Sequence, residues 1–416
     1  MAPESKKRKR DHGNGASAVD TSKPTAVFTP GKGRPYTVSV ALPSSIIAKS
    51  VPSASSKDER LTNISAQTHE QKTALAGTLA RAFAVFCVDE VVIFADGPSS
   101  PASSTARHNN PHAADDAASG YTAFSDPAHF LEHLLSYLET PPHLRRVLFP
   151  HHPNLRTAGS LQSVDMPHHL KVEEWCAYRE GVASAPFSEA NGGSGKKAKK
   201  EKKGEEYTTV NTGLPNPVVV PGAIPPHARV TVKFDDSEPP TSTASPLRAT
   251  AVAPSVPREE AGYYWGYTVR QAASLSGVFT EAPWQGGYDF CVGTSERGVT
   301  LAAFMEEQRV ASAPSESDSS SDSSSNSDSS SESDADEVKK APQWRHLLLT
   351  FGGVAGLENA LTHDQILQTK GIEDPKDLFD AYVNLVPQQG SRTIRTEEAV
   401  WCGLMGLRGW VLQNDV

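Results

Sequence analysis

Three segments combine glycine with polar or charged side chains, and each follows a stretch with the apolar character of a buried strand. They are Val292–Gly298 (VGTSERG), Thr350–Glu358 (TFGGVAGLE) and Asn384–Glu398 (NLVPQQGSRTIRTEE). Open α/β sheets bind ligands beyond the carboxyl ends of their strands. Glycine lets the backbone approach a ligand closely and present its N–H and C=O groups. The sequence therefore predicts that the three segments converge on one bound molecule.

Two of these segments differ in how strongly they indicate function. Gln389–Arg395 places two arginines and two hydroxyl residues in a short glycine-containing loop, where such side chains have little packing value. Gly352–Gly356 superficially resembles a dinucleotide-binding loop, but its glycine spacing does not match GxGxxG. A tight turn between a strand and a helix explains that second stretch equally well.

Histidine pairs are the other candidates for chemistry. His151–His152 and His168–His169 lack the i, i+4 spacing of a helical zinc site, and no Cys or Asp stands at ligand spacing from them. We expect these histidines to stabilise turns or contact phosphate, and we predict no metal site. The chain also has no GxSxG motif, no P-loop and no pair of carboxylates with catalytic spacing.

The first third of the chain has the pattern of an α/β sheet. Residues 36–43 alternate apolar with polar or small side chains, which predicts a strand, and residues 68–86 carry apolar side chains at helical spacing. Asp89–Asp96 (DEVVIFAD) is a short apolar run that predicts a buried strand. Ser125 or Asp126 is placed to cap a further helix. Strand, helix and strand in this order are typical of α/β folds.

The pattern changes between residues 162 and 260, where glycine, proline and valine replace helical periodicity. Val218–Val220 and Arg229–Phe234 look like short strands, which predicts a small barrel or sandwich. Residues 196–203 hold six lysines and are predicted to form a flexible basic loop. The middle of the chain is therefore predicted to be a β-rich insert.

Beyond residue 261 the α/β pattern returns. Strands are predicted at Tyr288–Gly293, ending in a glycine-containing turn, and at His346–Phe351. A last helix is predicted from about Thr396, because Glu397 and Glu398 would lie in its first turn, where the helix dipole favours carboxylates. The plan is one α/β domain that is split by the β-rich insert.

The distribution of charge along the chain bears on the class of molecule that the protein can bind. The formal net charge is -9, but Ser315–Glu337 contains eight acidic residues and no basic one, so the remainder of the chain sums to -1. A local basic face for a polyanion is therefore allowed. The surrounding tract 312–340 is too polar to bury and is expected to be a disordered loop. Its serines are either sites for acid-directed kinases or part of an inert solubilising loop.

Cysteine usage and the N-terminus indicate the compartment. Four widely spaced cysteines without a CxxC pair fit a reducing environment, and no stretch approaches the roughly 18 apolar residues of a membrane span. Residues 1–35 are predicted to be a disordered tail. Its Lys6–Arg10 run (KKRKR) fits nuclear targeting or loose nucleic-acid contact, with a merely solvated tail as the alternative. We expect the nucleus, and within it the nucleolus.

Several blocks of the chain carry a family resemblance. They are Leu148–Pro150, Asn154–Gly159, Met166–Leu170 (MPHHL), Tyr178–Val182 (YREGV), Tyr264–Arg270 (YWGYTVR), Tyr288–Gly298, Phe351–Glu358, Leu378–Asp380 (LFD) and Gln389–Ala399 (QGSRTIRTEEA). In this order they resemble one family of SPOUT-class RNA methyltransferases of archaea and eukaryotes, which has an OB-like domain inserted in its trefoil-knotted α/β domain. The long polar insertions, including the acidic tract, depart from that family and lie between the blocks.

The resemblance implies a fold, a cofactor and partners. Residues 36–161 and 261–416 would form the SPOUT domain, with a trefoil knot in the second part, and residues 162–260 would form the OB-like, RNA-binding insert. S-adenosylmethionine would lie bent in the knot, against the three segments. The implied activity is transfer of its methyl group to a nucleotide of structured RNA, above all ribosomal RNA. Two copies would pair at the knot as a homodimer.

The resemblance also directs the choice of site residues. Arg392 and Arg395 are predicted to contact a phosphate or stabilise a deprotonated base, because arginine stays charged and offers a rigid fork of donors. Glu296 or Arg297 would complete the pocket, and packing or dimer salt bridges are the alternative role for all four. The predicted cofactor-binding residues are Gly293, Thr294, Thr350, Phe351, Gly352, Gly353, Gly356, Glu358, Asn384, Pro387, Gln389, Gly390, Ser391, Thr393, Ile394 and Thr396.

Two other classes of protein compete with this hypothesis. A catalytically silent RNA-binding scaffold, in ribosome biogenesis or mitotic assemblies, would fit the barrel and the basic tail equally well. It would have no evident need for intact glycine segments, however. A Rossmann-type oxidoreductase or methyltransferase would need a glycine fingerprint after the first strand, and Val40–Ser45 (VALPSS) supplies none.

Overall fold

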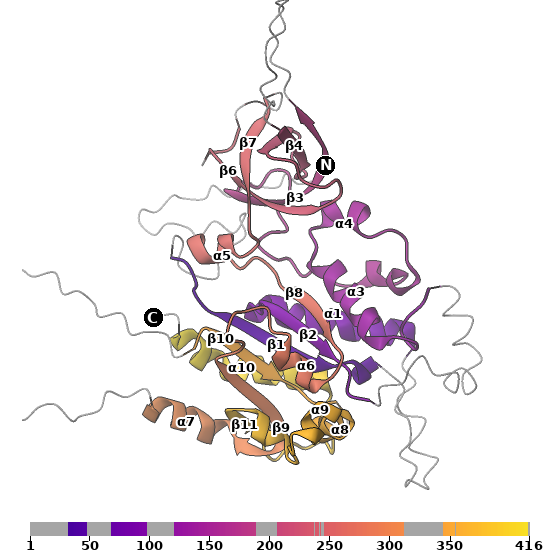
Figure 1. Cartoon of the computed structure of the whole chain (residues 1–416), viewed down its shortest axis with the longest axis vertical. Helices are drawn as coiled ribbons and strands as arrows, with labels where there is room; N and C mark the ends of the chain where they lie inside the picture. The colour runs from indigo at the N-terminus through magenta and orange to yellow at the C-terminus, as the bar shows by residue number, and fades with distance from the viewer. Residues whose placement is uncertain are drawn as a thin grey trace, which may run out of the picture.

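Six parallel strands form one sheet in the order β11-β9-β10-β1-β2-β8 (Figure 1). The strands are β1 (Thr37–Pro43), β2 (Glu90–Phe94), β8 (Thr268–Ala272), β9 (Phe290–Thr300), β10 (His346–Thr350) and β11 (Ala381–Asn384). This computed structural model describes residues 32–47, 68–97, 120–188, 206–236, 238–240, 242, 245–311, 344–353 and 355–414. The predictions for Lys6–Arg10, for the lysine stretch 196–203 and for the tract 312–340 lie outside the described residues.

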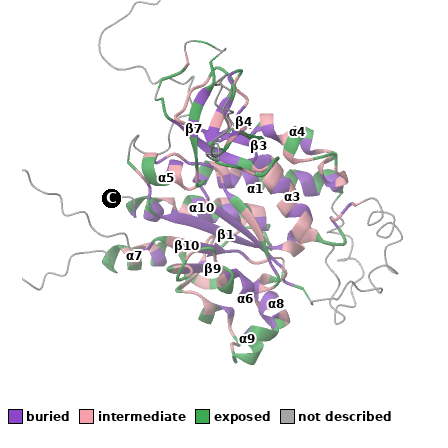
Figure 2. Ribbon diagram, turned by 45° about the horizontal axis from the view of Figure 1, so that its top comes forward, coloured by how far each residue is buried: buried purple, intermediate pink, exposed green. Residues whose placement is uncertain are grey.

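Helices cover both faces of this sheet. One face carries α1 (His69–Phe86), α3 (Pro127–Glu139), α7 (Leu301–Ala311) and α10 (Thr396–Gln413), and the other carries α6 (Leu275–Thr280), α8 (Gly356–His363) and α9 (Gln365–Thr369). Successive residues of β1 serve opposite faces, since Val40 and Leu42 lie in the first core and Ala41 in the second. Such a sheet needs strands that are apolar along their length, and Figure 2 shows β1 and β10 as buried.

Most of the elements predicted for the α/β part are confirmed. The strands at β1, β2 and β10 and the helices at α1, α3 and α10 lie where the sequence placed them. Thr68 caps α1 in a reciprocal capping box with Gln71. For α3 the cap is Asp126 and not Ser125, because a carboxylate oxygen of Asp126 accepts a 3.0 Å hydrogen bond from the N–H of His129.

The prediction for the strand at Tyr288–Gly293 was partly wrong. The strand β9 begins at Phe290 and continues to Thr300, so no simple turn follows Gly293. Gly293 and Val299 pair with the adjacent β11 residues Tyr382 and Val383, so the intervening part of β9 is looped out. Sequence periodicity could not show this, because the second half of β9 is polar and pairs with an edge strand.

The β-rich region contains a closed five-stranded barrel in the order β3-β4-β5-β7-β6. Its strands are β3 (Tyr178–Ser188), β4 (Glu206–Asn211), β5 (Val218–Pro221), β6 (Arg229–Phe234) and β7 (Leu247–Val252). Strands β5 and β7 pair in parallel, and the other neighbours are antiparallel. Valine side chains fill the interior, as the alternation along the strands predicted. The short helices α4 (Pro142–Leu148) and α5 (Val256–Ala261) flank the barrel in the sequence.

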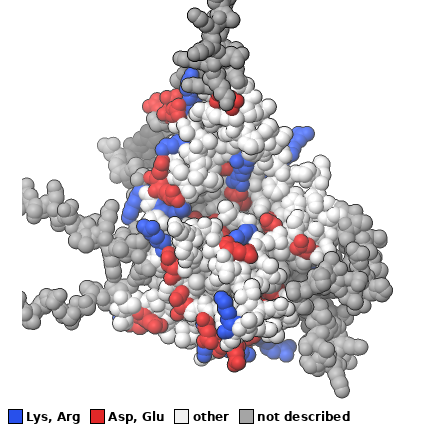
Figure 3. All heavy atoms as spheres, in the orientation of Figure 1, with Lys and Arg blue, Asp and Glu red and all other residues white. Residues whose placement is uncertain are grey.

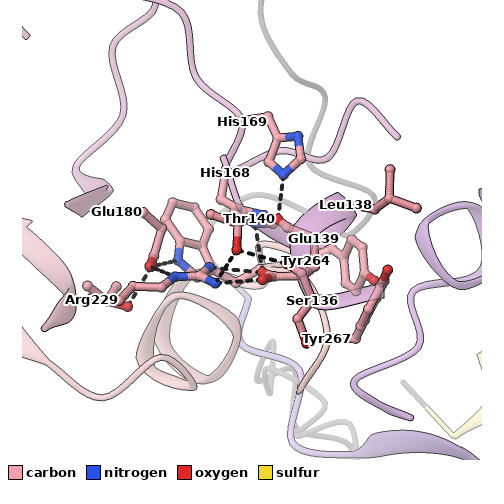
Figure 4. A network of polar contacts seen from close by, with 12 residues as sticks. Ser136, Leu138, Glu139, Thr140, His168, His169, Glu180, Arg229, Tyr264 and Tyr267 are labelled. Atoms are coloured by element: carbon pink, nitrogen blue, oxygen red, sulfur yellow. Dashed lines mark hydrogen bonds and ion pairs between the residues drawn. The ribbon is translucent and has the colours of Figure 1, made fainter. Parts of the chain in front are cut away.

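A buried polar network fastens the barrel to the helix α3 (Figure 4). The guanidinium of Arg229 on β6 donates two hydrogen bonds of 2.6 and 2.9 Å to the carboxylate of Glu139, at the end of α3. It also donates a 2.7 Å bond to Glu180 on β3, and the indole of Trp265 donates another of 2.7 Å to Glu180. The two carboxylates are only 7% and 2% exposed. One cation therefore neutralises two buried acids from different parts of the fold.

The contact with Arg229 also changes the pKa of the Glu139 carboxyl. Burial alone would raise the pKa of Glu139, but the charge and hydrogen bonds of Arg229, with a further hydrogen bond from His168, lower the pKa to about 2. The rings of His168 and His169 also donate from Nε2 to the backbone carbonyl of Glu139, at 3.0 and 2.6 Å. Their role is thus to hold a turn, as the sequence predicted.

The cysteines, the possible metal ligands and the helices bear on metal binding and on insertion into a membrane. Cys87, Cys176, Cys291 and Cys402 are all free thiols. Within the described ranges, no cluster of three His, Cys, Asp or Glu side chains is arranged to hold a metal ion. In the same ranges, none of the helices has the length and apolar character needed to cross a membrane.

Candidate active site at the carboxyl edge of the sheet

The three glycine-containing segments meet at the carboxyl ends of β9, β10 and β11. Three hydrogen bonds join them pairwise. The hydroxyl of Thr294 donates to the carbonyl of Thr350 at 3.0 Å, and the side-chain amide of Asn384 donates to the carbonyl of Glu296 at 2.9 Å. The hydroxyl of Thr396 donates to the carbonyl of Gly352 at 3.0 Å. Side chains from each segment therefore fix the backbone of another.

Glycine is required where β9 and β11 approach each other. A Cβ atom on Gly293 would lie 2.5 Å from the ring of Phe379, and one on Gly298 would lie 2.5 Å from the carbonyl oxygen of Tyr382. Both distances are too short for any side chain. The two glycines thus allow β9 to leave and rejoin β11 around the looped-out residues 294–298.

The second segment forms a tight turn from β10 into α8. The backbone N–H of Phe351 donates to the carbonyl of Ala41 on β1, and that of Gly356 donates to the carbonyl of Gly353, both at 3.0 Å. Gly356 has a φ of +74°, which glycine adopts at little cost. The turn that the sequence left open as an alternative is present. It nevertheless places Gly352 and Gly353, half-buried, beside the other two segments.

The predicted catalytic side chains lie at the surface of these segments. Arg392 and Glu296 are exposed, and Arg395, 75% exposed, lies 3.9 Å from Glu397 in its own helix. Arg297 forms a 3.2 Å ion pair with Glu358 across two segments. The structure thus brings the loops together without joining these arginines to a common described partner.

The predicted cofactor-binding residues fall into three classes of exposure. The buried ones are Gly293, Thr350, Phe351 and Thr396. The half-buried ones are Thr294, Gly352, Gly353, Gly356, Glu358, Asn384 and Gln389. The exposed ones are Pro387, Gly390, Ser391, Thr393 and Ile394. The third segment is therefore the most open wall of the site.

One buried acid at this edge was missed by the sequence reasoning. Asp96, 3% exposed, directly follows β2 and accepts hydrogen bonds from the N–H and hydroxyl of Ser45, at 3.2 and 2.5 Å. Burial raises the pKa of the Asp96 carboxyl above its ordinary value. A Cβ on Gly353 would lie 2.9 Å from the Ser45 hydroxyl. The rule that strand ends carry the site could have found Asp96, since it closes the DEVVIFAD run.

The site has features that fit a small bound molecule. The hydroxyl of Thr350 is fully buried and makes no hydrogen bond to any described residue. A Cβ on Gly352 would fill the space 3.0 Å from the backbone of Gly356. An unpartnered hydroxyl and a glycine-lined backbone suit a ligand that is held mainly by main-chain groups.

The sequence shows the family of proteins to which this fold and this site belong. The chain matches, over residues 37–407, the sequence model of the family described as "Putative RNA methyltransferase", and it belongs to that family. The predicted family is confirmed at this level, and a Rossmann-type oxidoreductase is not supported.

Particular relatives carry more specific names. A protein of Drosophila melanogaster named 28S rRNA (uridine-N(3))-methyltransferase is 37% identical over 377 residues, which cover 91% of this chain and 63% of that protein. The human protein of the same name is 35% identical over 383 residues, covering 92% of this chain and 80% of that protein. The chain thus spans less than two thirds of the fly relative. A putative methyltransferase named spot-1, from Caenorhabditis elegans, is 26% identical over 370 residues.

Proposed function

We propose that this chain transfers a methyl group from S-adenosylmethionine to N3 of a uridine in ribosomal RNA. The observation that carries the proposal is the pairwise hydrogen bonding of three glycine-containing segments at one sheet edge. The names of the fly and human relatives support uridine N3 and the large ribosomal RNA as the target. The knotted SPOUT class is part of the proposal.

The path of the chain supports a knot. The strand β11 lies at one edge of the sheet, whereas α10, which follows it, packs against α1. Residues 385–395 must therefore cross back over the carboxyl ends of β9 and β10. They reach α10 at Thr396, which is bonded to Gly352. A trefoil knot, in contrast to the unknotted majority of folds, would require this returning segment to pass between two of the chain's own loops.

The donor would lie against the glycine backbone of the three segments, where the unpartnered hydroxyl of Thr350 fits a polar group of the ligand. When bound, its sulfonium supplies an electrophilic methyl group. The site's own residues have to align the uridine with that methyl group. They also have to accept or pass on the proton of N3, which must leave as the new nitrogen–carbon bond forms and the sulfur–carbon bond breaks. Arg392 or Arg395 would stabilise the negative charge that develops on the base.

Mass spectrometry of nucleosides from ribosomal RNA tests this function. Cells that lack the protein are expected to lose one stoichiometric 3-methyluridine mark, and the wild-type chain is expected to restore it. Arg392→Ala should slow formation of the mark at least about a hundredfold, if this arginine supplies a charge-stabilising contact of the usual strength. Arg309→Ala, which removes an exposed arginine of α7 outside the site, is the matched control. Full methylation by Arg392→Ala with normal donor binding would refute the role of Arg392.

The barrel is proposed to hold the RNA. Numbered from its first strand, its order is 1-2-3-5-4, with strands 3 and 5 parallel, which is the arrangement of OB folds. Phe187, Tyr207 and Pro221 are neighbours across β3, β4 and β5. The rings of Phe187 and Tyr207 lie 6.2 Å apart, and Phe187 is 39% exposed. Rings in such a row suit stacking of unpaired bases. Residues 162–260 are proposed as the extent of this insert.

The helix α10 is proposed as the homodimer interface. Its exposed side includes Cys402, Met405 and Leu412, of which Met405 is 66% exposed. A stripe of this kind on a helix beside the proposed knot suits a second copy of the chain. Sedimentation should show a dimer for the wild type and a monomer for Met405→Glu; a dimer in both would exclude this face.

We propose the nucleus, and within it the nucleolus, as the location. The support is the KKRKR run at Lys6–Arg10 and the proposed ribosomal substrate. Microscopy of a fluorescent fusion tests it. A fusion in which Lys6–Arg10 are replaced by serines should remain in the cytoplasm, and equal nuclear signal in both would assign the run to a solvated tail.

A further inference from the structure

A continuous ladder of rings lies on the outer side of α3. It consists of one guanidinium and five rings, in the order Arg145, Tyr137, Phe149, His133, His152 and His129. Arg145 lies 4.8 Å from the centre of the Tyr137 ring. The successive ring centres that follow are 5.5, 5.7, 4.6 and 6.1 Å apart, and Phe149 and His133 are stacked within 20° of parallel. Each member is half-buried, so none is wholly enclosed in the core.

The ladder spans the distance between the two sites already described. The helix α3 packs against Ser44–Ile47, the short 3-10 helix at the carboxyl end of β1. The last residue of α3, Glu139, is bonded to Arg229 of the barrel. The helix that carries three of the rings therefore contacts both an element at the carboxyl edge of the sheet and the barrel, and Figure 1 shows α3 and α4 on that flank of the molecule.

The segment that follows α3 is basic. Residues 141–164 include Arg145, Arg146 and Arg156 and no Asp or Glu. Arg146 and Arg156 are exposed, whereas Arg145 is bound to the carbonyls of Thr140 and Leu138 at 2.8 and 2.9 Å. Figure 3, in the orientation of Figure 1, shows acidic and basic side chains interspersed over the visible face as a whole. A segment with only positive charge has the complementarity that phosphates need.

The His133 ring in the middle of the ladder is uncharged at neutral pH. Burial, with the neighbouring His152 and His129, lowers the pKa of His133 to about 4. The N–H of Asn154 donates to Nδ1 of His152 at 3.2 Å, which fixes that nitrogen as an acceptor. The three histidines do not form a metal site, since no such group occurs among the described residues. A neutral imidazole next to phenylalanine and tyrosine is suited to stacking on bases.

We propose that this ladder, together with Arg146 and Arg156 of the segment that follows α3, is a binding surface for unpaired RNA that guides the strand from the barrel to the candidate active site. The proposal rests on the proposed function, because RNA is taken as the substrate. Bases would stack on the faces of these rings. The two exposed arginines would contact the phosphates.

Stacking and phosphate contact have different signatures, which a binding assay separates. The probe is a fluorescent oligouridylate of about 12 nucleotides, within the range of site sizes for such proteins, bound to the full chain without donor at several salt concentrations. His133→Leu and Phe149→Leu keep apolar volume but remove the ring, and each should weaken binding about tenfold with an unchanged salt slope. The double variant Arg146→Gln/Arg156→Gln should reduce that slope by about 1.4, or roughly 0.7 for each lost phosphate contact.

Controls make each outcome decisive. Val147→Ala alters an exposed side chain on α4 that is not part of the ladder, and should bind as the wild type does. Wild-type affinity in both leucine variants, or an unchanged slope in the arginine variant, would overturn the proposal. If a leucine variant does not fold, the arginine variant still decides, because its two side chains are exposed. Phe187→Ala reports on the barrel alone. Normal RNA binding without methyl transfer would refute the proposed function and leave this surface intact.

Discussion

Replacing Arg229 with leucine should lower the free energy of unfolding by about 3–5 kcal/mol, the usual cost of leaving a buried charge without its partner. Arg229 is the cation that meets both Glu139 and Glu180, and the leucine would leave two carboxylates that are 7% and 2% exposed. Urea denaturation measures the loss. Adding Glu139→Gln to the leucine variant should recover part of it, because one of the two stranded charges is then removed.

A second cation on the same strand supplies the control. Lys233 also forms an ion pair, with Glu260, but both side chains are largely exposed, at 43% and 51%. Exposed pairs contribute little, so Lys233→Met should cost far less than Arg229→Leu. Equal losses in the two variants would mean that the network at Glu139 does not hold the barrel in place.

The network around Glu139 also makes the free energy of unfolding depend on pH in the acid range. The pKa of Glu139 is about 2 in the folded chain, below its ordinary value of 4.5. The unfolded chain therefore binds this proton more readily, so the contribution is present above pH 4.5 and is lost as the pH falls toward 2. Without Arg229, His168 would still oppose burial, but the largest opposing contribution would be gone and the pKa of Glu139 would be higher. The wild-type advantage over Arg229→Leu should shrink across that acid range.

The parts of the fold that the sequence predicted are those with a local signal. β2 and β10 are buried on both faces, so their apolar runs are visible without knowledge of their neighbours, and β1 is visible from its alternation of apolar with polar or small residues. The strands β8 (TVRQA) and β11 (AYVN) escaped notice because they are edge strands and are only partly buried. An edge strand lacks a neighbour on one side, and its sequence does not need to be apolar throughout.

The candidate site likewise has parts that the sequence predicted and parts that it could not predict. Glycines and hydroxyl residues after strands were predictable, since topology places strand ends at one edge. The looping out of residues 294–298 was not, because it depends on contact with Phe379 and Tyr382. The pair of Glu139 and Arg229, 90 residues apart, has no local signal at all. Long-range charge pairing is fixed only when the barrel docks.

The most direct test of the donor site is at Gly352. Its absent Cβ lies 3.0 Å from backbone atoms of Gly356 and Leu357, which cannot rotate away as a side chain would. Gly352→Val should force this turn outward and weaken the binding of S-adenosylmethionine by about 100-fold, equal to roughly 2.7 kcal/mol. Calorimetry measures the affinity. Gly159→Ala, at an exposed glycine with open space around the added methyl, is the control.

A change of fold could mimic this result, and Thr350→Val excludes that explanation. Valine has nearly the shape of threonine, and the Thr350 hydroxyl has no hydrogen-bond partner among the described residues. The substitution should therefore leave the unfolding free energy unchanged or slightly higher, because an unsatisfied buried hydroxyl is removed. If that hydroxyl serves the donor, affinity should still fall about tenfold. Unchanged affinity in both Thr350→Val and Gly352→Val would mean that the donor does not lie against β10, and the proposed site would have to be abandoned.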